Sequence, residues 1–333
     1  MPFFLKNLGS KLFADDTTLY KSADDVDLLV TDFKRALLPF TEWCNFNKLD
    51  INWSKTEFMF ICDKRKVVLP TSITIDGNEV KVVSSFRLLG VILDNKLNFS
   101  AHISATCLMV NRKLFSIKRL FYLATSVKMQ FFKSFILPYF DYCLSLSVYF
   151  PKATLQKICT CYYATLFRLF KLDFTDFDAN KINDFLKNYG LYAFQHRVFM
   201  RLSLFTYKAL SDSAPPILRD LISTSIDTEH SSVPTSYPSR EKRVLNLRSG
   251  KKTVLNKPDS KYAKISFSSI FSKVKEKCIS SYHNRNFHTF KNSICANLNS
   301  IADEFCTIFP AFFYLSYRKY NFKRKKIVNK HVK

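Results

Sequence analysis

The chain has 333 residues, of which 47% are hydrophobic and 16% aromatic. This composition excludes an intrinsically disordered protein and suffices for two or three packed subdomains. Its 51 Lys and Arg against 27 Asp and Glu give a formal charge of +24, which favours polyanionic partners, nucleic acid above all, with a membrane surface or solubility alone as the alternatives.

Two further features bound the cellular context. The longest apolar stretch, residues 131–150, contains Lys133, Pro138 and Asp141, so we do not expect a membrane span. The nine cysteines follow no repeating spacing and no signal peptide precedes them. Reduced thiols in a cytoplasmic or nuclear protein are therefore the simplest expectation.

The first predicted element is a tight β-hairpin over residues 12–20. Apolar and β-favouring residues flank the adjacent carboxylates Asp15 and Asp16, which predicts a strand, an acidic tip and a return strand. Neighbouring like charges favour solvent or a cation, and Mg²⁺ takes carboxylate oxygens while leaving positions for phosphates. An acidic surface turn without a ligand is the alternative.

The elements that follow predict an α+β unit. Asp24 or Asp25 is expected to cap a helix. The apolar residues of this helix recur at intervals of three or four and form a stripe along one side. Within residues 57–62 bulky residues alternate with others, which predicts a strand packed beside the acidic hairpin. An Asp-Gly turn predicts a second hairpin over residues 73–82. The helix stripe consists of Leu28, Leu29, Phe33, Leu37, Phe40 and Trp43.

From residue 100 the pattern becomes helical. Arg112, Lys113 and Arg119 lie off an apolar seam, so we expect an exposed basic face, either a phosphate-contact surface or an ordinary solvated one. Further helices are predicted over residues 127–137, where a proline ends the helix, and over 155–172 and 191–210. The seam itself consists of Ile103, Cys107, Val110, Leu114, Ile117 and Phe121.

Three motifs in order resemble those of the reverse transcriptases of non-LTR retrotransposons. Residues 13–16, Phe-Ala-Asp-Asp, resemble the polymerase box, and residues 52–57, Asn-Trp-Ser-Lys-Thr-Glu, resemble the N-x-x-K-T element. Residues 86–94 resemble the LGV-x-hydrophobic-D hairpin, and residues 97–103 its usual continuation. His196 is expected to be structural. The resemblance covers residues 10–220 well and the rest loosely.

The resemblance implies RNA-templated DNA synthesis by two-metal nucleotidyl transfer, with an RNA template, a DNA primer and Mg²⁺, and without a small-molecule cofactor. Asp15 and Asp16 would be catalytic metal ligands, and Lys55 would neutralise or protonate the leaving pyrophosphate. Leu89 and Gly90 would press against the primer, where glycine permits close approach. For Lys55 the alternative is an exposed lysine without a ligand, and for Leu89 and Gly90 it is a turn that serves only the geometry of the hairpin.

We therefore expect an α+β fold. An incomplete polymerase palm over residues 1–98 precedes a mainly helical thumb-like region over residues 99–223. Residues 224–260 are expected to form a linker or irregular loop. Residues 261–317 are expected to form a C-terminal region. Residues 318–333 contain many Lys and Arg and no acidic residue, and we expect a basic tail that binds nucleic acid weakly.

A two-metal polymerase site also needs a third carboxylate, on a strand that precedes the acidic hairpin, and fingers that position template and nucleotide. The chain begins too late for either, so we expect an N-terminally truncated fragment that is inactive alone with weak Mg²⁺ binding. A non-catalytic, basic nucleic-acid-binding protein derived from such an element is the second hypothesis. A helical protein without a nucleic-acid partner is the third, and salt-independent binding would favour it.

Overall fold

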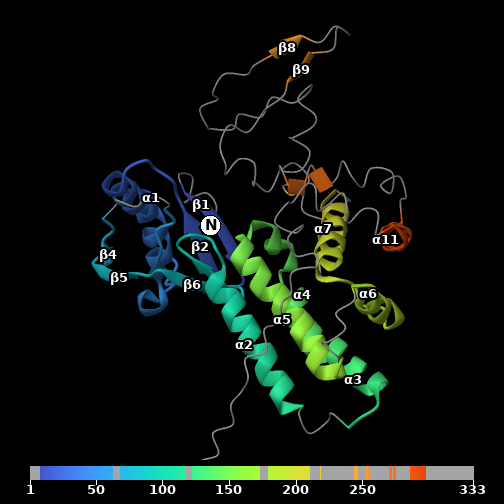
Figure 1. The fold of residues 1–333 in the computed structure, drawn as a ribbon. Coiled ribbons are helices and arrows are strands. Elements are labelled where there is room, and N and C mark those ends of the chain that lie inside the picture. The colour runs from blue at the N-terminus through green and yellow to red at the C-terminus, as the bar shows by residue number, and fades with distance from the viewer. Residues whose placement is uncertain are drawn as a thin grey trace, which may run out of the picture. The chain divides into compact units, whose positions relative to one another are not determined.

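The computed structural model describes residues 8–62, 68–117, 122–172 and 179–210. Beyond these it describes residue 218 and the short stretches 244–246, 252–254, 270–271, 273–274 and 286–297. The chain divides into two compact units, Met1–His102 and Ile103–Lys333, and each is described by itself. The protein mixes helices with small sheets (Figure 1), so the expectation of mixed α and β structure is confirmed.

Three antiparallel hairpins organise the first unit, each closed by a two-residue loop. In the second and third hairpins both loop residues have positive φ: Asp76 (49°) and Gly77 (75°), then Leu89 (46°) and Gly90 (84°). Such left-handed pairs match the natural twist of the strands. The predicted Asp-Gly hairpin is confirmed. The strands are β1 (Gly9–Phe13) with β2 (Asp16–Tyr20), β4 (Ser72–Ile75) with β5 (Asn78–Val82), and β6 (Ser85–Leu88) with β7 (Val91–Asp94).

The long helix α1 (Val26–Phe46) begins at Asp25, whose carboxylate accepts the backbone N–H of Leu28 at 2.9 Å. This satisfies one of the free donors of the first turn. The side chain of Leu28 is 56% exposed, so its prediction on the buried stripe was wrong: it lies five residues before Phe33, on the opposite side of the helix. The residues that α1 does bury are Phe33, Leu37, Phe40, Thr41 and Cys44.

The core of the first unit joins α1 to the sheet of β4 and β5. Its buried residues are Leu8, Phe33, Leu37, Phe40, Cys44, Phe60, Ile73, Ile75 and Val80. Leu19 of β2 and Trp53 are partly buried against this same cluster. One hydrophobic core therefore supports both the acidic hairpin and the segment that leads to Lys55.

The strand predicted over residues 57–62 is shorter than expected and pairs elsewhere. Strand β3 contains only Glu57–Phe58 and runs parallel to β5 in a three-stranded sheet, whereas β1 and β2 form a sheet of their own. Strand β3 therefore does not pair with the acidic hairpin, although Phe58 and Phe60 pack in the same core as Leu19 of β2, as the expected packing requires. Phe60, two residues after the strand, is buried in the core, and its ring centroid lies 4.9 Å from that of Phe58. Beyond Phe58 this segment therefore contributes side-chain packing rather than ladder hydrogen bonds.

The second unit is mainly helical in its described residues. It contains α2 from residue 103 onward, α3 (Thr125–Phe131), α4 (Leu137–Asp141), α5 (Lys152–Phe170), α6 (Ala179–Asn188), α7 (Phe194–Leu210) and α11 (Phe287–Ala296). A π-helical turn, η4 (Phe132–Ile136), and a 3-10 turn, η5 (Leu144–Tyr149), lie between α3 and α5. Strands β8 (Val244–Asn246) and β9 (Lys252–Val254) pair within the segment predicted as a linker.

Helix α2 (Ser100–Ser116) buries the predicted seam: Ile103, Cys107, Val110 and Leu114 within the helix, and Ile117 just after it. Arg119 and Phe121 lie outside the described residues, as does the predicted basic tail. Helix α5 runs beside α2 (Figure 1), where the Lys157 ammonium bonds the Ser104 hydroxyl at 2.6 Å. It starts three residues earlier than predicted, directly after Pro151.

Pro138 does not end the second helix as predicted. The π-helical turn η4 precedes it, and the backbone continues helically through Asp141. Proline lacks an N–H and is tolerated at the start of a helical segment. The wider π turn makes Pro138 such a start, since it stands in the first turn of α4. In the described part of the chain, none of the helices combines the length and apolarity needed to cross a membrane.

Candidate functional site

The acidic pair lies at the tip of the first hairpin, as the sequence predicts. Phe13 pairs with Asp16 across the two strands, so Ala14 and Asp15 form the loop. Ala14 has a φ of 53°, a left-handed conformation that lets the chain reverse within two residues. Asp15 and Asp16 are both exposed. Two carboxylates are therefore presented side by side to solvent.

The base of this hairpin is closed by an aromatic ring. Gly9 pairs with Tyr20, and a Cβ atom added at Gly9 would lie 2.3 Å from the tyrosine ring. A glycine therefore lets the ring lie flat across the opposite strand. Together with the partly buried Leu19, this packing anchors the hairpin at the end opposite its acidic tip.

Lys55 ends a short 3-10 turn that Asn52 organises. The Asn52 side-chain oxygen accepts the Ser54 hydroxyl at 2.7 Å and the Lys55 N–H at 3.2 Å. The Thr56 hydroxyl donates to the Asn52 carbonyl at 2.9 Å. The Lys55 side chain itself is exposed. The Asn and Thr of the motif thus hold the backbone, and the lysine is its outward group.

Asp94, the last residue of the third motif, fixes a loop. Its carboxylate accepts three backbone N–H groups: Lys96 at 3.1 Å, Asn98 at 3.1 Å and Phe99 at 2.7 Å. Leu97 and Phe99, with φ of 50° and 56°, are non-glycine residues in the left-handed region, which costs free energy. Asp94 offsets that cost and sets the start of α2.

The donor set at the acidic tip fits Mg²⁺ only in part. Mg²⁺ is commonly held by one or two carboxylates, with waters and substrate phosphates as its other ligands. Asp15 and Asp16 supply the two carboxylates. Among the residues that the structure describes, no cluster of three His, Cys, Asp or Glu side chains forms a metal site. The pair therefore suits an ion that phosphates help to hold.

The predicted basic face of α2 is open to solvent at its two described residues, Arg112 and Lys113. Leu108 and Phe115 are exposed on the same helix, and their spacing of four and three residues from Arg112 places these three side chains on one face. This face combines a cation with apolar and aromatic surface, a combination that suits phosphate and base contacts.

Comparisons with protein-family models, with curated proteins and with solved structures find no match. The functional assignment therefore rests on the motifs and on the geometry of the residues.

The structure brings some of the predicted residues together and separates others. Asp15 and Asp16 share one hairpin tip, and the Lys55 turn shares its supporting core. Leu89 and Gly90 form the tip of a hairpin in a different sheet.

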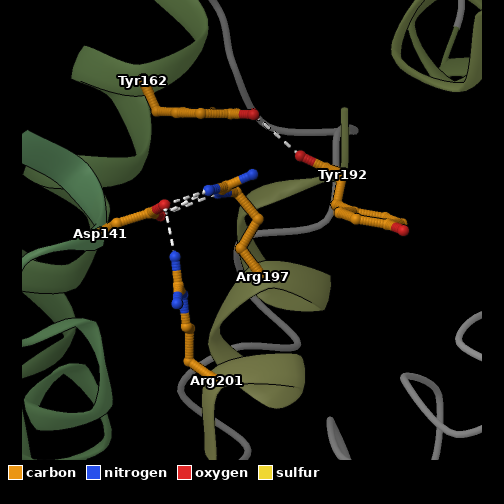
Figure 2. Close-up of polar contacts among 5 residues, drawn as sticks. All are labelled: Asp141, Tyr162, Tyr192, Arg197 and Arg201. Carbon is orange, nitrogen blue, oxygen red and sulfur yellow. Dashed lines mark hydrogen bonds and ion pairs between the residues drawn. The ribbon is translucent and has the colours of Figure 1, made fainter. Parts of the chain in front are cut away.

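A charged cluster in the second unit escaped the sequence analysis. The Arg197 guanidinium on α7 donates to the Asp141 carboxylate at the end of α4, from Nε at 3.2 Å and from Nη2 at 2.6 Å (Figure 2). Arg201, one turn further, donates to the same carboxylate at 2.8 Å. Nearby, the Tyr162 hydroxyl donates to the Tyr192 carbonyl at 2.8 Å. The sequence did contain an indication of this cluster, since Asp141 stands in an apolar stretch and a buried charge needs a partner.

Proposed function

We propose that this chain is the C-terminal part of the palm, with the thumb, of a non-LTR retrotransposon reverse transcriptase, whose family activity is RNA-templated DNA synthesis. One observation carries the proposal: the acidic pair lies at an exposed hairpin tip, and the Lys55 turn is anchored on the same hydrophobic core. The motif order along the chain supports it. As an isolated protein, the chain is proposed to be catalytically incomplete.

In this proposal each site residue has a chemical role. Asp15 and Asp16 would hold Mg²⁺, which supplies positive charge next to the reacting phosphates. Lys55 would neutralise the leaving pyrophosphate, because its exposed ammonium extends from a turn whose backbone Asn52 holds in place. The Leu89–Gly90 turn lies against the primer, where a glycine admits close backbone approach.

The α2 face, defined by Arg112 and Lys113, is proposed to contact the phosphates of the template–primer duplex. Each phosphate that a protein neutralises releases counterions, and the binding constant then falls with salt on a log–log slope of about −0.9 per phosphate. Both side chains are exposed and lie outside the set of residues that α2 buries. They can therefore contact phosphates while the packing of α2 stays unchanged.

The test is a titration of a fluorescent RNA–DNA hybrid duplex at several salt concentrations. Replacing Arg112 and Lys113 by Ala should make the log–log slope of the binding constant against salt less negative by up to about 1.8, the contribution of two phosphate contacts. Lys34→Ala with Arg35→Ala is the matched control, since both are exposed residues of α1 and the charge change is equal. Equal slopes for the two double variants would contradict the duplex contact.

The acidic pair is tested separately with Mn²⁺, a paramagnetic substitute for Mg²⁺, in the presence of a deoxynucleoside triphosphate. We expect water-proton relaxation to report Mn²⁺–nucleotide binding that Asp15→Asn with Asp16→Asn removes. Asp24→Asn with Asp27→Asn is the control, because both carboxylates are exposed near the start of α1. Equal binding by the two variants would contradict the metal assignment.

The second candidate function is a non-catalytic, basic nucleic-acid-binding protein derived from such an element. The exposure of Arg112 and Lys113 beside Phe115 favours it, since binding through this face needs no metal. Salt-dependent duplex binding without nucleotide-dependent Mn²⁺ binding would support this candidate over the first.

A further inference from the structure

Two cysteine thiols meet where α2 packs against α5. Hydrogen bonds from Lys157 to Ser104 and from Arg168 to Asn111 set the register of the two helices and bring Cys161 of α5 level with Cys107 of α2, where the two thiols influence each other's ionisation. Cys107 is 9% exposed, and Cys161 is partly exposed. Both are free thiols in the structure. Neither residue belongs to the motifs or to the proposed nucleic-acid surface.

Polar contacts on both sides hold the two helices in register at this point. The Lys157 ammonium donates to the Ser104 hydroxyl at 2.6 Å, and Arg168 donates to the Asn111 side-chain oxygen at 3.3 Å. Cys107 lies between Ser104 and Asn111 on α2, as Cys161 lies between Lys157 and Arg168 on α5. The two thiols thus lie between two cross-helix hydrogen bonds, which hold α2 and α5 in register at this level.

The surroundings make the two thiols chemically unequal. The hydrogen bond from Cys161 lowers the pKa of Cys107, against the opposing effect of burial, and the nearby Lys157 ammonium lowers it further. The hydrogen bond to Cys107 and burial raise the pKa of Cys161. The thiolate form is the nucleophile in cysteine oxidation. The pair therefore has an attacking sulfur at Cys107 and a protonated neighbour at Cys161.

We propose that Cys107 and Cys161 form a reversible intramolecular disulfide when the protein is exposed to hydrogen peroxide. The Cys107 thiolate attacks one peroxide oxygen, which gives a sulfenic acid and hydroxide. The Cys161 sulfur then attacks the sulfenic sulfur, forming the S–S bond and releasing water. Overall, two thiols and one peroxide give one disulfide and two waters. A thiol reductant reverses the change.

The disulfide would join α2 to α5 covalently across the helical unit. A cross-link between residues distant in sequence restricts the unfolded chain and so stabilises the folded one, provided that the native geometry accommodates it. The register of α2 and α5 already brings the two cysteines to the same level of the neighbouring helices. We therefore expect a higher Tm for the oxidised protein, lost again on reduction.

The test treats the purified full chain with a small excess of hydrogen peroxide, followed by alkylation of the remaining thiols and peptide mapping by mass spectrometry. We expect a linked peptide pair that contains Cys107 and Cys161, with the loss of two hydrogens. Cys107→Ser and Cys161→Ser should each abolish it. Cys62→Ser, at a partly exposed cysteine of the first unit, is the control and should retain it.

A second measurement tests whether Cys107 is the cysteine that is oxidised first. In the Cys161→Ser variant, a sulfenic-acid trapping reagent should label Cys107, because no partner thiol remains to consume the intermediate. If that variant does not fold, as judged by circular dichroism, the peptide map of the unsubstituted chain decides alone. Oxidation elsewhere that leaves both Cys107 and Cys161 as free thiols would overturn the proposal.

Discussion

The guanidinium of Arg197 forms an ion pair with the carboxylate of Asp141 inside the helical unit. Arg197 is 5% exposed, and 56 residues separate the two partners in sequence. The pair joins the end of α4 to α7, and Figure 2 shows Arg201 approaching the same carboxylate. A buried guanidinium without an anion would keep its full desolvation cost, so the folded state of this unit depends on Asp141 for part of its stability.

The first prediction concerns this pair. Asp141→Asn should lower the free energy of unfolding of the helical unit by about 3–5 kcal/mol, because it leaves Arg197 charged, buried and unpaired. Far-UV circular dichroism during urea denaturation measures the change. Arg201→Gln is the control: Arg201 is 45% exposed in its side chain, and such exposed pairs contribute about 0–1 kcal/mol. Equal costs for the two variants would contradict the role of burial.

The second prediction concerns Asp94. Asp94→Ala removes the acceptor of three backbone N–H groups and should destabilise the first unit by about 1.5–3 kcal/mol. Trp43 and Trp53, the two tryptophans of the chain, lie in that unit, so fluorescence follows its unfolding. Asp50→Ala, at an exposed position, should have little effect. An unchanged midpoint for Asp94→Ala would show that the loop does not depend on the carboxylate.

The sequence predicts local features of the fold well. The hairpin loops follow from residues that tolerate left-handed backbone, such as Gly77 and Gly90, and the seam of α2 follows from the spacing of its apolar residues. These features depend on neighbours within a few positions. The acidic tip belongs to this class, which is why Asp15 and Asp16 were placed correctly.

Features that depend on distant residues were not predictable. The short β3 pairs with β5, more than twenty positions later, and nothing in residues 57–62 indicates which strand they will join. The π turn that admits Pro138 arises in a packed bundle whose partners are remote. The Asp141–Arg197 pair likewise needs the fold to bring α4 and α7 together.

The third prediction is a pH dependence at His102. Burial, and then the positive charge of Arg87, lower the pKa of this imidazole in the folded protein. The unfolded chain therefore binds the proton more readily, and stability falls as pH drops below the ordinary histidine pKa of about 6.5. His102→Gln should lose less stability between neutral and mildly acidic pH. Tryptophan fluorescence at several pH values measures the difference, and identical profiles would contradict the lowered pKa.

The fourth prediction is that the isolated chain does not extend a DNA primer on an RNA template, even with Mg²⁺ and all four nucleotides. In-line displacement requires metal ions to clamp both the attacking and the leaving oxygen. Asp15 and Asp16 offer two carboxylates, and no cluster of three metal-ligating side chains occurs in the part of the chain that the structure describes.

A primer-extension assay on purified protein measures this directly, with Asp15→Asn plus Asp16→Asn as the control. Metal clamping and orientation supply much of the rate acceleration in such reactions, so a partial site should lose nearly all of it. We expect no extension by either protein. Extension by the unsubstituted chain that the double variant lacks would contradict the prediction, and would mean that a further carboxylate of this chain completes the acidic pair.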